Sequence, residues 1–182
     1  MHNLTSSCDN VAIGWKAVDA VTTGATNVAI GKDALGAATA HSCNNIAIGE
    51  LAIGTGVGGG TAGQGSFNIA LGKSALSALT TGVDNIMIGC QPGDAITTGN
   101  QNIGIGAAAL GASTDGCKNI AIGSLALSGV LGKSGSDDAC NNIAIGTSAS
   151  ATLTCGHSNI AIGHYALGSA TTGQYNLSLI HI

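Results

Sequence analysis

The stretch "CNNIAIG" occupies residues 43–49, and the same seven letters return at residues 140–146. Close variants stand elsewhere in the chain, among them "TNVAIG", "FNIALG", "DNIMIG", "QNIGIG", "KNIAIG" and "SNIAIG". A phrase that returns at a regular period is the sequence signature of a repeat architecture, in which each unit stacks on the next. The chain is therefore predicted to be a stack of similar coils.

The asparagine that opens each phrase defines the period of the array. Most intervals between these asparagines are 17 residues long, one is 18 and two are 23. The consensus is Asn-(Ile/Val)-Ala-Ile-Gly-x-x-Ala-Leu, followed by a polar stretch that often reads Thr-Thr-Gly. In stacked coils the asparagines form one column, in which each side chain bonds the next. This predicted structural ladder consists of Asn10, Asn27, Asn45, Asn68, Asn85, Asn102, Asn119, Asn142 and Asn159, and the array closes on Asn176.

The alternation of large and small apolar residues in the phrase predicts a short β-strand, because successive side chains of a strand point to opposite faces. The Ala-Leu pair predicts a second short strand, and the Thr, Ser, Gly, Asn and Asp residues around it predict turns. The segments between glycines are too short for stable helices. The predicted fold class is therefore all-β, a parallel β-solenoid of about nine coils in which two coils are 23 residues long.

We expect one face of the predicted strand to pack in the core and the other face to pack against other chains. We expect the large residues to face the core, so that an Ile145→Asp chain would unfold around a buried charge. The predicted core residues are Ile46, Ile48, Ile120, Ile122, Ile143, Ile145, Ile160 and Ile162. We expect the small residues to form a smooth outer column that packs against other copies of the chain, a trimer face made of Ala47, Ala121, Ala144 and Ala161.

Composition argues against several classes of partner and of function. Charged residues make up 8% of the chain, the basic residues are five lysines without arginine, and the net charge is −4, which disfavours a nucleic-acid partner. No apolar run is long enough to insert into a membrane.

"GTGVGG" at residues 54–59 fits a dinucleotide-binding pattern but lacks the following helix and the acidic residue. The histidines share no ligand spacing. We therefore expect no catalytic site, no cofactor and no metal, and the chain is not expected to be an enzyme.

Four of the six cysteines occupy one position of the repeat. Cys8, Cys43, Cys117 and Cys140 each stand two residues before a repeat asparagine. Cys117 and Cys140 belong to successive coils, within reach of a disulfide, whereas Cys8 and Cys43 are two coils apart. The sequence leaves two possibilities open for the Cys117 and Cys140 pair, a disulfide in an oxidising environment or two free thiols in a turn.

The two 23-residue coils each carry six additional residues after the apolar pair. Insertions in solenoids lie on one face and often make the contacts with a partner, although neutral drift in exposed loops is the alternative. The candidate receptor-contacting residues in these loops are Thr55, Gly59, Gln64, Lys133, Asp137 and Asp138.

The repeated "NIAIG" or "NVAIG", with "AL" and "TTG" behind it, resembles the head repeat of YadA-type trimeric adhesins. It resembles still more the N-x-A-I-G-x-x-A-L-x-x-x-T-T-G arrays of predicted phage tail fibres, because YadA-type heads have shorter repeats. The resemblance covers residues 10–176. It implies a left-handed β-roll, three chains around one axis, and an attachment role in a virion tail fibre, with a carbohydrate or protein of the host surface as partner.

The chain divides into a lead-in (1–9), the repeat domain (10–176) and a short tail (177–182). We interpret the tail, "LSLIHI", as a translated sequencing adapter, with a divergent last strand as the alternative. Two other functions compete with a tail fibre. One is the head of a bacterial trimeric autotransporter adhesin at the cell surface. The other is an ice-binding β-solenoid, suggested by the Thr-Thr-Gly segments at Thr22, Thr80, Thr97 and Thr171.

Overall fold

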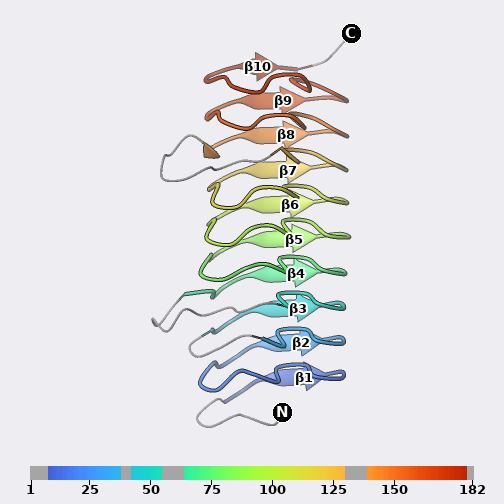
Figure 1. Ribbon diagram of the computed structural model, residues 1–182, viewed down its shortest axis with the longest axis vertical. Coiled ribbons are helices and arrows are strands. Elements are labelled where there is room, and N and C mark those ends of the chain that lie inside the picture. Colours follow the sequence, from blue (N-terminus) through green and yellow to red (C-terminus); the bar gives the residue numbers. More distant parts are fainter. Residues whose placement is uncertain (1–7, 38–41, 55–63, 130–138, 180–182) are drawn as a thin grey trace.

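The fold of the chain is a parallel β-solenoid, as its repeats predict. The computed structural model describes residues 8–37, 42–54, 64–129 and 139–179. Ten short strands form one sheet in sequence order, with about nine coils between them, and all arrows in Figure 1 point the same way. The strands are β1 (Val11–Ile13), β2 (Val28–Ile30), β3 (Ile46–Ile48), β4 (Ile69–Leu71), β5 (Ile86–Ile88), β6 (Ile103–Ile105), β7 (Ile120–Ile122), β8 (Ile143–Ile145), β9 (Ile160–Ile162) and β10 (Leu177–Ser178).

The register of the sheet follows the repeat, so each residue of the phrase stacks on its equivalent in the next coil. Ile46 pairs with Ile69, and Ala47 pairs with Ala70. The two 23-residue coils keep the same register as the 17-residue coils, since β7 and β8 pair residue for residue across the second insertion. The ladder therefore continues in register across both insertions. In the tail, the strand β10 pairs in parallel with β9.

The assignment of the two strand faces made from the sequence is wrong, because the small residues face the interior. The alanines predicted to form an outer trimer face are fully buried, each with an exposed fraction of 0%: Ala47, Ala121, Ala144 and Ala161. The isoleucines predicted to form the core point outward. The third strand residues are exposed (Ile48, Ile122, Ile145 and Ile162), and the first are half-buried (Ile46, Ile120, Ile143 and Ile160).

The width of the coil explains this inversion. The Ala-Leu pair on the opposite wall sends its leucine into the interior, and Leu76, Leu110 and Leu127 are fully buried. A leucine reaching across a narrow coil leaves room only for a methyl group on the sheet side, since protein interiors are close-packed. The core is therefore built from the strand alanines and the leucines that face them.

In one coil the large side chain is on the strand and the small residue is on the opposite wall, which supports this explanation. Met87 occupies the strand position that is usually alanine, and Gly93 occupies the position that is usually leucine. A Cβ built on Gly93 would lie 3.0 Å from the Met87 sulfur, and a Cβ built on Gly104 in the next coil would overlap the same sulfur. The methionine thus fills the space that two glycines leave open.

The Ala-Leu segment is a turn rather than the second strand that the sequence predicts. Each described coil places residues at positive φ in three places: two residues after the strand glycine, at the leucine position (Gly93 in the coil of β5), and before the asparagine. Ser74 (54°), Leu76 (52°) and Asp84 (58°) are one such set. Left-handed residues cannot continue a strand, so each of these positions bends the chain toward the next side of the coil.

The glycine that ends each strand is required by the stacking. Gly123 has φ of 131°, and a Cβ built on it would lie 2.6 Å from the carbonyl oxygen of Gly146 in the next coil. This is far inside van der Waals contact, and the conformation also disfavours side chains. The column of strand glycines therefore lets successive backbones approach closely at this corner.

Candidate functional site

The repeat asparagines form a continuous hydrogen-bonded ladder inside the solenoid. The Oδ1 of Asn102 accepts from the backbone N–H of Asn119 at 3.0 Å and from its Nδ2 at 3.2 Å. The Nδ2 of Asn102 donates to Oδ1 of Asn85 at 3.0 Å and to the carbonyl of Gly116 at 2.7 Å. Both ends of the buried amide are thus fully bonded, which a buried polar group requires.

The same pattern recurs along the described chain, from Asn10 to Asn176. An amide is the only side chain of this size that both accepts two such bonds and donates two. The structure therefore brings the predicted ladder residues together as a structural element. They leave no polar group directed at a ligand.

A second column, two residues before the asparagines, also bonds neighbouring coils to each other. Here the side chain of one coil accepts a bond from the backbone N–H of the coil before it. Asn100 accepts from Val83 at 2.8 Å, and Ser66 accepts through its hydroxyl from Cys43 at 3.1 Å. At the equivalent step across the second insertion, a disulfide joins the two cysteines of successive coils, which decides between the two possibilities left by the sequence. The bonded pair is Cys117 and Cys140.

The Cys43 and Ser66 step is one substitution away from a second disulfide. The two residues occupy the positions of Cys117 and Cys140, and both steps span a separation of 23 residues. We expect a Ser66→Cys chain to form a disulfide between Cys43 and the introduced cysteine, which stabilises the fold by about 3 kcal/mol, the entropic value for a loop of this size. Mass spectrometry under oxidising conditions and urea unfolding with and without reductant measure this. A Val83→Cys chain, whose neighbours in the column are not cysteines, is the control.

The outward residues of the strands form an apolar surface, which we call the isoleucine strip: the first and third residues of β1–β9. Its third residues show nearly constant exposed fractions of 36–38% in β3 and β5–β9. Every described coil contributes to it, so the strip runs the length of the sheet in Figure 1. The alternation in the sequence predicts an apolar outer face of the strands, but it assigns the alanines to that face, whereas the structure places the isoleucines there.

Two of the four threonines behind the ice-binding alternative, Thr80 and Thr97, bond through their hydroxyls to the next coil. The hydroxyl of Thr80 donates to the carbonyl of Thr97 at 2.9 Å, and that of Thr97 donates to the carbonyl of Thr114 at 3.1 Å. Thr154 makes the same bond to Thr171. These hydroxyls are bonded within the protein instead of forming a free rank toward solvent.

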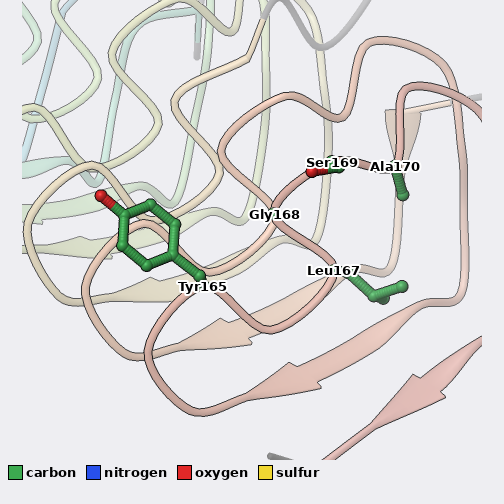
Figure 2. A pocket seen from close by; sticks show the side chains of 5 residues that line it. All are labelled: Tyr165, Leu167, Gly168, Ser169 and Ala170. Atoms are coloured by element: carbon green, nitrogen blue, oxygen red, sulfur yellow. The ribbon is translucent and has the colours of Figure 1, made fainter. Parts of the chain in front are cut away.

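Two shallow cavities lie on the last coils of the described chain. The larger, of about 540 Å³, is lined by Tyr165 and residues 167–170. Figure 2 shows the Tyr165 ring on one side and Leu167 and Ala170 on the other, with Gly168 and Ser169 between them. Its polar groups are backbone and hydroxyl groups, without an acid–base pair. The smaller, of about 400 Å³, is lined by residues 155–156 and 172–174.

Other candidate chemistry in the described residues is sparse. They contain no group of three or more metal-binding side chains and no helix long and apolar enough to span a membrane. Partial burial raises the pKa of Asp94, while backbone hydrogen bonds from Asp94 and Ala95 act in the opposite direction. Asp94 lies in a turn and is half-buried.

The predicted receptor loops fall mostly outside the described residues. Thr55, Gly59, Lys133, Asp137 and Asp138 are outside them. Gln64 is described and half-buried, in the turn that returns the first insertion to the ladder.

Comparison of the chain with protein-family models, curated proteins and solved structures gives no match.

Proposed function

We propose that this chain is a structural segment of a homotrimeric attachment fibre, of the kind found in phage tails. The observation that carries the proposal is the isoleucine strip, which leaves β-branched residues in water along the whole sheet. Because the alanines lie inside, the trimer face is this strip and not the alanine column. The finer fold assignment, a left-handed β-roll of the head-repeat type, belongs to the same proposal.

The size of the strip supports association. Its third residues are 36–38% exposed in β3 and β5–β9 and 58% exposed in β1, so the strip forms an apolar patch that extends along the sheet. A typical monomer exposes no contiguous apolar patch above about 300–600 Å². Burying this area removes from water the largest regular apolar surface of the described chain. The number three and the axis come from the resemblance to trimeric fibre repeats.

A trimer of this form suits attachment. Three equivalent copies of every outward corner stand at each level of the axis, so weak contacts with a repeated ligand add up through avidity. The ligand is then a carbohydrate or a protein of the host surface, and the place of action is the virion tail fibre. A bacterial adhesin head at the cell surface uses the same geometry and is the alternative. The ice-binding alternative has less support, since the hydroxyls of Thr80 and Thr97 are bonded within the stack.

Sedimentation of the purified chain tests the proposal. We expect a trimer at micromolar concentration, and an Ile122→Lys chain that sediments as a folded monomer, because three ammonium groups would meet where the isoleucines pack. Ser124→Lys, on the exposed corner beside the strip, is the matched control and should remain trimeric. A monomeric parent chain, or a trimeric Ile122→Lys chain, would contradict the assembly.

A further inference from the structure

One corner of the solenoid brings together an aromatic ring and several lysines. The Nζ of Lys16 lies 4.5 Å from the ring centroid of Trp15, and the Nζ of Lys32 in the next coil lies 5.7 Å from it. Glu50 in the third coil pairs with Lys32 at 3.8 Å and with Lys73 in the fourth coil at 3.6 Å. We call these five residues the Trp15 corner.

The Trp15 corner is exposed and locally positive in an acidic protein. Trp15 has an exposed fraction of 61%, and the side chains of Lys32 and Lys73 are 56% and 63% exposed. Three of the five lysines lie here, while the whole chain carries a net charge of −4. Glu50 balances part of this charge and holds Lys32 and Lys73 in line, and Asp33 lies 4.0 Å from Lys32 and balances a further part, so three lysines face two carboxylates here. The ammonium of Lys16 faces the ring of Trp15.

The geometry of the corner restricts its ligand. The lysines belong to the first, second and fourth coils, so their ammonium groups spread over roughly 14 Å along the axis at the coil spacing. The two cavities described above lie on the last coils and not at this corner. The site instead offers a flat ring and a line of point charges. An extended polymer with sugar rings and regularly spaced negative charges matches both features.

We propose that the Trp15 corner binds a linear anionic saccharide, with a sugar ring against Trp15 and acidic groups along Lys16, Lys32 and Lys73. The proposal rests on the attachment function proposed above and names its ligand class and site. Ammonium groups accept carboxylate, sulfate or phosphate alike, since each lysine acts as a point charge. Three such corners on a trimer would bind the same polymer with avidity.

The single tryptophan of the chain makes the test direct. Titration with polygalacturonate is expected to change the Trp15 emission, with an affinity that falls as salt is raised. In calorimetry, Lys16→Gln should weaken binding by about three- to tenfold, the loss of one exposed charge contact. Lys118→Gln, an exposed lysine at another corner of the coil, is the matched control and should leave the affinity unchanged. Neutral dextran should not bind.

Several results would overturn the saccharide site. One is an unchanged emission with polygalacturonate and with a sulfated polysaccharide. Another is an equal loss of affinity in Lys16→Gln and Lys118→Gln, which would indicate general charge attraction. Binding of oligo-deoxythymidine without either polysaccharide would assign the corner to nucleic acid instead. Sedimentation of the same samples separates the two proposals, because a trimer that binds no polymer contradicts only this one, and a monomer that binds contradicts only the assembly.

Discussion

An Ala144→Asp chain is expected to lose its solenoid fold around β8, whereas an Ile145→Asp chain is expected to keep it. The two positions are adjacent in one strand and receive the same new side chain, so local strand propensity is nearly matched. Ala144 is fully buried, and Ile145 has an exposed fraction of 37%. A carboxylate at position 144 would lie among the leucines of the opposite wall without a partner, at a cost of at least about 4 kcal/mol.

The readouts are the β-sheet circular dichroism signal, urea unfolding and sedimentation. Ile145→Asp should retain the folded signal and lose the trimer, since its carboxylates would meet in the proposed interface. Ala144→Asp should unfold at much lower urea concentration, because each coil of a solenoid is stabilised mainly by its neighbours. The opposite order, with Ile145→Asp unfolded and Ala144→Asp folded, would restore the alanine-outward arrangement expected from the sequence.

The second large effect is expected from one rung of the asparagine ladder. Asn102→Asp keeps the shape of the side chain but removes the Nδ2 donor that bonds Asn85 and the carbonyl of Gly116. A carboxylate oxygen would then face two acceptors in a site with an exposed fraction of 0%. We expect a loss of about 3–5 kcal/mol at neutral pH, the range for an uncompensated buried charge.

The pH dependence of this variant has a definite sign. Burial and the two facing oxygens raise the folded-state pKa of the new carboxyl above its unfolded value of about 3.9. The folded state therefore holds the proton more tightly than the unfolded state does. The loss of stability should be smallest below the unfolded pKa, where the group is protonated, and should grow as pH rises toward the folded-state pKa.

A matched control for this rung lies two residues away. Asn100 uses its Oδ1 to accept from the backbone N–H of Val83, and it is half-buried at the surface. An aspartate accepts that bond equally well, so Asn100→Asp should change the free energy of unfolding by less than about 1 kcal/mol. Urea unfolding at neutral and acid pH measures both variants. Equal, pH-independent losses would show that the ladder tolerates a charge.

The sequence alone determined the features that depend on spacing. The period of the asparagines predicted the strand that follows each of them, the parallel order of these strands and the all-β class, because equivalent residues of a stack must lie in register. It did not exclude the second strand expected at the Ala-Leu pair, which the structure shows as a turn. The position of the cysteines brought Cys117 and Cys140 within reach of each other. The extra length of the 23-residue coils predicted loops outside the ladder, as the unbroken pairing of β7 and β8 requires.

Only the tertiary structure decided which face of the strand lies inside. Alternation separates isoleucine from alanine but does not say which of them the opposite wall leaves room for. That room depends on the width of the coil. The left-handed conformation at the leucine position sets this width, because it directs the leucine side chain inward. Met87 opposite Gly93 shows the same rule with the sizes reversed. The strand and the opposite wall share one narrow interior. The space left beside the inward leucine decides which strand residue fits inside, and this outweighs the greater hydrophobicity of isoleucine. The larger strand residues therefore lie on the outer surface.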